Sequence, residues 1–308
     1  MGEEISKTLL EAGAEAEGMR LDHFLARRMT TAGRYALRQA IANGLVTVNQ
    51  QARRRSYKLK AGDLVEVSTP IPCSHAFIPE AIPITVVFED EHILVVDKPA
   101  NMLVHPSKSV RCGTLMNALT HYLQQHDPSA RPGLIHRLDR HTSGLMVIAK
   151  TEQAHRVLSR HFGKRMVTKK YLALVHGVVE QDHLEIRLPI AWTGETFPHW
   201  HASPEGRQTL TIVRVIERFR AFTLLEAEPK TGRTHQIRIH LAALGHPLAG
   251  EELYARQECE SSLLRRHFLH ASFLQFRHPR TGQWLSFTSP LPEELDQFIR
   301  RLRQNASA

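Results

Sequence analysis

The stretch from Gly133 to Lys150 constrains the fold of this chain most, because charged residues in it lead directly into apolar ones. Residues 145–149, Leu-Met-Val-Ile-Ala, are apolar without interruption, which is typical of a strand buried on both faces. Two arginines, two histidines and Asp139 precede them, followed by Thr-Ser-Gly, a turn signal. If residues 135–139 are extended, Arg137 and Asp139 share a face, because the strand period is two. The guanidinium would then lower the carboxyl pKa and keep Asp139 ionised.

The motif within this stretch carries the strongest functional signal. Taken alone, an arginine and an aspartate close in sequence most often form a surface salt bridge. However, residues 136–139, His-Arg-Leu-Asp, followed by residues 142–144, Thr-Ser-Gly, resemble the signature of the RluA family of RNA pseudouridine synthases. The resemblance implies that Asp139 is the catalytic carboxylate. The position of Arg137, close to Asp139 in the motif, also suits a second role, in which its side chain fills the gap that an extracted base leaves in the RNA.

The reaction that the resemblance implies is the isomerisation of uridine to pseudouridine in RNA. The N1–C1′ glycosidic bond breaks, the uracil turns while bound, and C5 joins C1′. Nothing is oxidised or hydrolysed, so we expect no cofactor and no metal. Asp139 either adds to C1′ or removes the C2′ proton, and both routes require the ionised carboxylate.

A second signature lies where two lysines precede the predicted strand 171–177. The resemblance implies that Tyr171 sits by the target base and serves in catalysis. A tyrosine suits this task because it offers a flat face for stacking and a hydroxyl that can move a proton. The alternative is a tyrosine that only fills the core at the start of a strand.

The third signature is the run 231–238, Thr-Gly-Arg-Thr-His-Gln-Ile-Arg. Its apolar spacing predicts a helix with Thr234 as the cap, so Arg233 would lie just before a helix N-terminus, which favours anions. The resemblance implies that Arg233 pairs with the catalytic Asp139, and Arg238 is the reserve candidate for that pairing.

The N-terminal part of the chain is strongly basic. Residues 18–60 hold ten lysines or arginines and a single acid. Residues 18–25 resemble the start of the S4-like RNA-binding domain, and clustered cations can straddle a phosphate backbone. The alternative is a solvated basic face on an ordinary small domain. The side chains that we expect to bind RNA are Arg20, Arg34, Arg38, Arg53, Arg54 and Lys58, with Arg137 and Arg238 near the catalytic motif.

Composition suggests the domain limits. Residues 1–17 hold five glutamates and one lysine, which predicts a flexible acidic arm. The S4-like domain spans residues 18–68, and a linker with four prolines spans residues 69–83. The catalytic domain spans residues 84–303.

Beyond the linker, the chain reads as strands in hairpins with helices between them, and no β-α-β series appears. We therefore expect an α+β chain. The resemblance implies a pseudouridine synthase fold with a mixed, largely antiparallel central sheet, preceded by a small α/β S4-like domain. The family usually carries Gly-Asp where this chain has Gly250-Glu251. That departure leaves the role of the Glu251 carboxylate open.

The net charge of +9 favours a polyanionic partner, and the resemblance implies RNA. The 23S RNA of the large ribosomal subunit is the expected substrate, because family members with an N-terminal S4-like domain mostly modify this RNA. Transfer RNA is the alternative substrate. A non-catalytic RNA-binding or ribosome-assembly protein is the alternative function, and the retention of Asp139, Tyr171 and Arg233 speaks against it.

Other classes fit less well. A hydrolytic glycosidase or nuclease would need two working carboxylates or a metal cluster. The three cysteines are scattered along the chain, so they indicate neither a zinc site nor a disulfide framework. The chain has no secretory signal and no apolar run near the roughly 20 residues of a membrane span. We therefore expect a cytoplasmic protein that does not enter a membrane, with a monomer as the default state.

Overall fold

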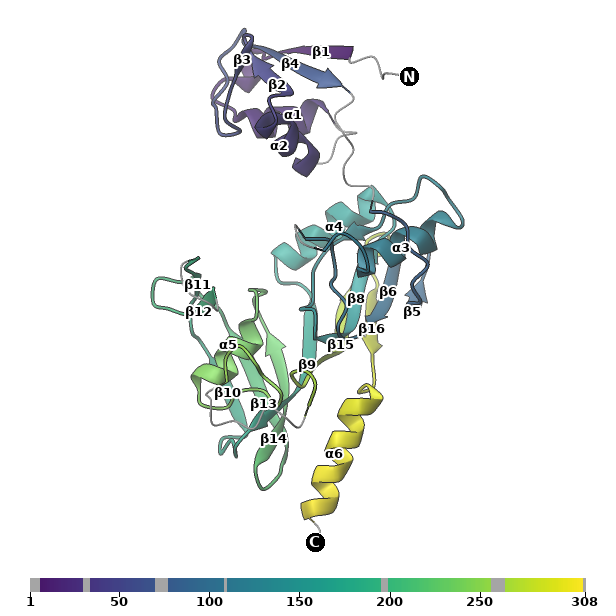
Figure 1. Cartoon of the computed structure of the whole chain (residues 1–308), viewed down its shortest axis with the longest axis vertical. Helices are drawn as coiled ribbons and strands as arrows, with labels where there is room; N and C mark the ends of the chain where they lie inside the picture. Colours follow the sequence, from purple (N-terminus) through teal and green to yellow (C-terminus); the bar gives the residue numbers. More distant parts are fainter. Residues whose placement is uncertain are drawn as a thin grey trace. The chain divides into compact units, whose positions relative to one another are not determined.

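The computed structural model describes residues 6–29, 34–69, 77–107, 110–194, 199–255 and 264–306. Internal contacts divide the chain into two compact units, Met1–Phe77 and Ile78–Ala308 (Figure 1). The division falls inside the predicted linker, residues 69–83.

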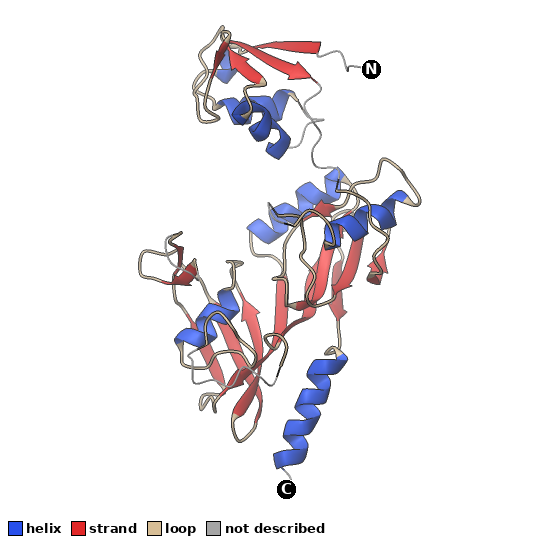
Figure 2. Ribbon diagram, viewed as in Figure 1, coloured by secondary structure: helices blue, strands red, loops and turns tan. Residues whose placement is uncertain are grey.

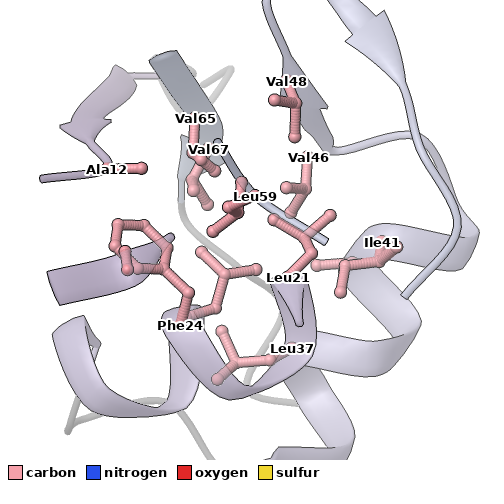
Figure 3. Close-up of a cluster of buried hydrophobic side chains, with 13 residues drawn as sticks. Ala12, Leu21, Phe24, Leu37, Ile41, Val46, Val48, Leu59, Val65 and Val67 are labelled. Carbon is pink, nitrogen blue, oxygen red and sulfur yellow. The ribbon is translucent and has the colours of Figure 1, made fainter. Parts of the chain in front are cut away.

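The first unit packs helices against a small antiparallel sheet. The sheet has the order β1 (Ser6–Glu11), β4 (Leu64–Thr69), β2 (Val46–Val48) and β3 (Gln51–Ala52). The helices are the 3-10 turn η1 (Ala14–Ala16), α1 (Leu21–Arg28) and α2 (Arg34–Ala42). Figure 3 shows how Leu21, Phe24 and Leu37 of the helices meet valines of β2 and β4 in one core.

The expected acidic arm is wrong for most of its length. Residues 6–11 form β1, which pairs antiparallel with β4 from Ser6 opposite Thr69 to Glu11 opposite Leu64. Leu10 packs against the core, and Ala12 and Ala16 are buried in it. Composition suggested an arm because the segment is rich in glutamate, but an edge strand needs only a few inward apolar side chains. Residues 1–5 lie outside the described part.

The second unit is built on a ten-stranded mixed sheet with the path β10-β13-β14-β9-β15-β8-β6-β5; β16 pairs with β15, and β7 pairs with β8 (Figure 2). Its strands are β5 (Thr85–Glu89), β6 (Ile93–Lys98), β7 (Gly133–Leu134), β8 (Ser143–Ala149), β9 (Thr168–His176), β10 (His183–Ile186), β13 (Thr211–Arg218), β14 (Phe222–Pro229), β15 (Leu269–Arg277) and β16 (Trp284–Thr288). Neighbours are antiparallel except β8 and β15. The expectation of a mixed, largely antiparallel sheet is confirmed.

In the described part of this unit, the remaining elements are helices and a small hairpin. They are α3 (Leu115–Gln124), α4 (Glu152–Gly163), α5 (Gln236–Ala243) and α6 (Glu293–Ala306), with the hairpin β11 (Ile190–Trp192) and β12 (Trp200–Ala202). Ala154 and Leu158 of α4 join the core over β6, β8 and β15. Leu295 and Ile299 of α6 join a second cluster with β9 and β14. Among the described residues, no helix is long and apolar enough to cross a bilayer.

Strand β8 fixes the end of the charged motif in space. Every residue of β8 is buried, as the apolar run predicted. Its first residues pair in parallel with β15, Ser143 opposite His270 and Gly144 opposite Ala271. Gly144 has φ +116°, and a Cβ there would lie 2.4 Å from the carbonyl oxygen of Ala271. The motif therefore needs glycine at this position, so that two backbones can approach at the point where the chain enters the core.

Candidate active site

Asp139 lies in the irregular segment between β7 and β8 and lines a cleft of about 540 Å³. Leu138 beside it is buried, and the turn ahead of β8 is closed by the Thr142 N–H, which donates to the Asp139 carbonyl oxygen at 3.2 Å. The Asp139 side chain keeps an exposed fraction of 18%. A buried neighbour and a closed turn therefore hold this carboxylate at the cleft surface.

Two cationic or polar side chains from the other side of the cleft approach Asp139. An Nη atom of Arg238 lies 3.5 Å from Oδ2, and the Nε2 of His235 lies 3.7 Å from the same oxygen. Arg238 is buried in the first turn of α5, whereas His235 is the residue before the helix. The carboxylate thus faces one fixed guanidinium and one imidazole.

The prediction that Arg233 pairs with Asp139 is wrong in this structure. Helix α5 begins at Gln236, and His235 rather than Thr234 occupies the capping position, with φ 55° and no side-chain capping bond. Arg233 therefore stays in the exposed loop before the helix, and the reserve candidate Arg238 makes the contact. Arg137 also lines the cleft, but it is exposed, and it makes no ion pair with Asp139 within the described ranges.

Glu251 fixes the guanidinium of Arg238. The Arg238 Nε donates to one carboxylate oxygen at 2.8 Å, and an Nη donates to the other at 2.6 Å. Glu251 is 1% exposed and also accepts the Leu253 N–H at 3.0 Å. A two-point arginine–carboxylate pair sets the plane of the guanidinium, so its remaining Nη is aimed at Asp139. The glutamate that departs from the family pattern has a clear structural role.

Tyr254 holds the imidazole of His235. Its hydroxyl lies 2.7 Å from Nδ1, and its ring lies 5.3 Å from the Arg238 guanidinium carbon. Burial raises the pKa of Tyr254 to about 12, and burial also lowers the pKa of His235. Both groups are therefore neutral near pH 7. When Tyr254 donates to Nδ1, the imidazole proton lies on Nε2, facing Asp139. Sequence reasoning missed both residues, although His235 lies inside the third motif.

Tyr171 lies on β9, opposite Ala227 of β14, and lines the same cleft as Asp139. It is 8% exposed. Burial, and next the Asp139 charge, raise the pKa of the Tyr171 phenol well above its ordinary value. The hydroxyl therefore stays protonated, and the ring presents a neutral surface beside the carboxylate.

The cleft is strongly cationic. Asp139 is the single carboxylate among the described residues that line it. The cationic side chains in the lining are Arg137, Arg165, Lys169, Lys230, Arg233 and Arg238. A cleft with this balance favours an anionic ligand and disfavours a cationic one. Among the described residues, no group of three or more histidine, cysteine, aspartate or glutamate side chains could hold a metal ion.

Two buried cations support the motif from behind, and sequence reasoning missed both. The Lys98 ammonium donates to the carbonyl oxygens of Pro99, Met102 and Arg140 at 2.7, 2.9 and 3.2 Å. Burial, and next the Arg266 charge, lower the pKa of Lys98 to about 7. Because Arg140 directly follows Asp139, Lys98 anchors the backbone that carries the carboxylate.

Arg266 anchors the next part of the same segment. It donates to the His141 carbonyl oxygen at 3.0 Å and to the Ser143 hydroxyl at 3.2 Å. Glu294 of α6 accepts from it at 2.7 Å. Thr142, between these two contacts, lies 2.9 Å from His267 Nε2 through its hydroxyl. The segment that leaves Asp139 is therefore held at successive residues.

The basic residues predicted to bind RNA in the first unit do not form a single type of site. Arg20 is paired with Asp22 through two contacts of 2.9 and 3.0 Å, so its charge is balanced within the unit. Arg53 covers the Tyr57 ring at 5.0 Å. Arg38, Arg54 and Lys58 are exposed. The side chain of Arg34 lies outside the described part.

Comparison with known families matches both units. Residues 92–243 match the family described as RNA pseudouridylate synthase, and residues 19–65 match the S4 domain. The first match contains Asp139, Tyr171 and Arg238 together.

Individual relatives match over nearly the whole chain. An uncharacterized RNA pseudouridine synthase of Bacillus subtilis is 37% identical over 299 residues, which cover 96% of this chain and 98% of the relative. Ribosomal large subunit pseudouridine synthase D of Nitrosomonas europaea is 38% identical over 295 residues, with 93% of this chain and 85% of the relative covered. The solved structure of human RNA pseudouridylate synthase domain containing 1 aligns with a TM-score of 0.57 at 25% identity, over 73% of this chain and 96% of that one.

Proposed function

This chain belongs to the RluA family of RNA pseudouridine synthases, and from that premise we propose that it isomerises uridine in large-subunit ribosomal RNA with Asp139 as the catalytic carboxylate. The observation that carries the proposal is the Asp139 carboxylate, which is the single carboxylate among the described residues of a cationic cleft, is held by Arg238 at 3.5 Å and lies beside a buried tyrosine. Binding RNA alone requires cations and does not require this buried arrangement. A non-catalytic role therefore leaves the Asp139–Arg238–Glu251 array without a purpose.

Each residue of the cleft has a separate role in the proposed reaction. Ionised Asp139 acts at the sugar, either by adding to C1′ or by removing the C2′ proton, and both routes release N1 of the base. The base turns, C5 forms the new bond to C1′, and the C5 proton is lost while N1 gains one. Arg238 and His235 orient Asp139 through both steps, because a carboxylate that rotates freely would meet the sugar less often in the reactive geometry.

Tyr171 acts through its ring and its protonated hydroxyl. A buried phenol beside a carboxylate resists ionisation, so we assign it to stacking on the uracil and to hydrogen bonding rather than to work as a phenolate. Arg137, exposed on the cleft lining, fills the space that the extracted base leaves in the RNA. The basic residues of the S4 unit supply grip that does not depend on sequence.

We propose the RNA of the large ribosomal subunit as the substrate, because relatives that align over nearly the whole chain are named ribosomal large subunit pseudouridine synthase D. We propose that the protein acts as a monomer. We also propose that the protein works in the cytoplasm, where ribosomal RNA is modified.

The test of the substrate uses the fate of the C5 hydrogen. Unmodified large-subunit RNA, small-subunit RNA and transfer RNA are transcribed with tritium at uridine C5 and incubated with the protein. Release of tritium from large-subunit RNA alone supports the proposal. Release from transfer RNA alone assigns the enzyme to that substrate, and no release from any of them contradicts the proposed substrates.

A further inference from the structure

Two neighbouring lysines of β9 have opposite surroundings. Lys170 lies 3.2 Å from a carboxylate oxygen of Glu226 on β14, and its ammonium faces the Phe273 ring at 5.7 Å. Lys169 points the other way, because adjacent side chains of a strand alternate between faces, and it lines the active-site cleft. One lysine is neutralised on the sheet and the other faces the cleft.

The ammonium of Lys169 has no counter-ion among the residues that the structure describes. Its Nζ lies 6.0 Å from the centre of the Phe162 ring and 4.0 Å from the place that a Cβ on Gly232 would take. Within the described ranges, no carboxylate or carbonyl oxygen is bonded to it. Burial lowers the pKa of Lys169, with no carboxylate to oppose the effect. Removing a cation from water without a partner is costly, so this position is suited to an anion that enters with the substrate.

Two arginines of the same cleft are exposed beside it. Arg165 follows α4 in a left-handed conformation with φ 59°, and Arg233 belongs to the loop that faces Lys169 across Gly232. Lys230 lines the cleft too, but it is already paired with Glu228. Arg165, Lys169 and Arg233, like Arg137, are therefore cations of the cleft lining that have no acidic partner in the described part of the chain.

The spacing along β9 relates Lys169 to the target base. Residues 169 and 171 share a face, and their Cα atoms are about 6.8 Å apart, since an antiparallel strand rises 3.4 Å per residue. Both side chains line the active-site cleft, so a base and the phosphodiester beside it can contact them together. A base stacked on Tyr171 would place its phosphodiester near the Lys169 ammonium.

We infer that Lys169, together with Arg165 and Arg233, forms a subsite for the phosphodiester group next to the uridine that is isomerised. This inference rests on the proposed function, because it places the base against Tyr171. It gives Arg233 a role that contact with Asp139 does not supply. It also explains why the surroundings of the two adjacent lysines differ. Lys170 stabilises the sheet through its ion pair, whereas Lys169 binds a phosphodiester group of the RNA backbone.

The test compares Lys169→Gln with Lys170→Gln, a matched control one residue away whose loss leaves Glu226 paired with Arg214 at 3.5 Å. Binding of unmodified large-subunit RNA transcript is measured from low to high salt, alongside tritium release. Loss of one phosphate contact should reduce the slope of log Kobs against log salt by about 0.7 and weaken binding about tenfold. Lys170→Gln should keep the wild-type slope, and Lys169→Arg should restore it.

The outcomes separate this inference from the proposed function. If the wild type releases tritium and K169Q keeps the slope and affinity of K170Q, the phosphate subsite is wrong. A K169Q variant that loses turnover at saturating RNA with an unchanged slope also overturns it, because Lys169 would then act on the reaction itself. If thermal unfolding shows that K169Q is not folded, the variant Arg233→Gln, which changes an exposed side chain, is used in its place. It must then lower the slope of log Kobs against log salt by the same amount. Absence of tritium release from the wild type would count against the proposed substrate alone.

Discussion

Arg238 lies 3.5 Å from Asp139 while its other two guanidinium nitrogens are occupied by Glu251. The Asp139 carboxylate, which we propose is catalytic, is therefore paired with an arginine whose orientation is set by a second, buried carboxylate. This arrangement links Asp139 to two residues that lie 99 or more positions further along the chain.

Glu251→Gln should weaken both folding and turnover. Removing one partner of a buried ion pair leaves the Arg238 charge poorly compensated, so the free energy of unfolding should fall by about 3 kcal/mol. The guanidinium would also lose its fixed plane, and kcat should fall. Denaturant unfolding and tritium release measure the two effects. Glu217→Gln breaks a more exposed pair with Arg303 and should cost no more than about 1 kcal/mol, with kcat unchanged. Equal losses in both variants would contradict the account.

Tyr254→Phe should lower kcat about fivefold, which is the effect of one neutral hydrogen bond. Without the hydroxyl, nothing holds the His235 proton on Nε2, and the imidazole faces Asp139 less consistently. Because both residues act through one contact, adding Tyr254→Phe to His235→Ala should cost little more than His235→Ala alone. Tyr122→Phe serves as the control, since it removes a hydroxyl bonded to Glu89 at 2.7 Å in another part of the unit. Additive losses would argue against the Tyr254–His235 link.

Lys98→Met should change how stability depends on pH. The folded-state pKa of Lys98 is lowered to about 7, whereas an unfolded lysine titrates near 10.4. Below pH 7 both states hold the proton, so the cost of the buried charge is fully present. As pH rises through 7 the folded state loses the proton first, and the wild type gains stability. Relative to K98M, it should gain about 2 kcal/mol between about pH 7 and pH 9. Parallel curves from denaturant unfolding would show that Lys98 stays charged.

The sequence was sufficient wherever local pattern decides structure. The uninterrupted apolar run before Lys150 correctly indicated a strand buried on both faces, and the hairpin and helix patterns led to the α+β class. The family motifs also brought Asp139 and Tyr171 to one cleft. In each case the signal was a period of two or of about 3.6, or a motif of several fixed positions.

The sequence did not predict contacts that depend on the exact residue at which a helix or strand begins. Arg233 and Arg238 belong to one motif, and only the start of α5 at Gln236 decides which of them is buried against Asp139. The strand at residues 6–11 was hidden because its partner, β4, lies more than fifty residues away along the chain. Lys98 follows a strand signal, but nothing in its neighbours shows that its ammonium is buried beneath Arg140.

The most direct test of the central claim is tritium release by Asp139→Asn, a variant that keeps the size of the side chain and removes only its charge. Large-subunit RNA labelled at uridine C5 is used at saturating protein, and RNA binding is measured in the same samples. We predict that D139N binds this RNA with the wild-type salt dependence and releases no tritium above background. Release at a rate near that of the wild type would contradict it, because the reaction would then not depend on the carboxylate around which the cleft is built.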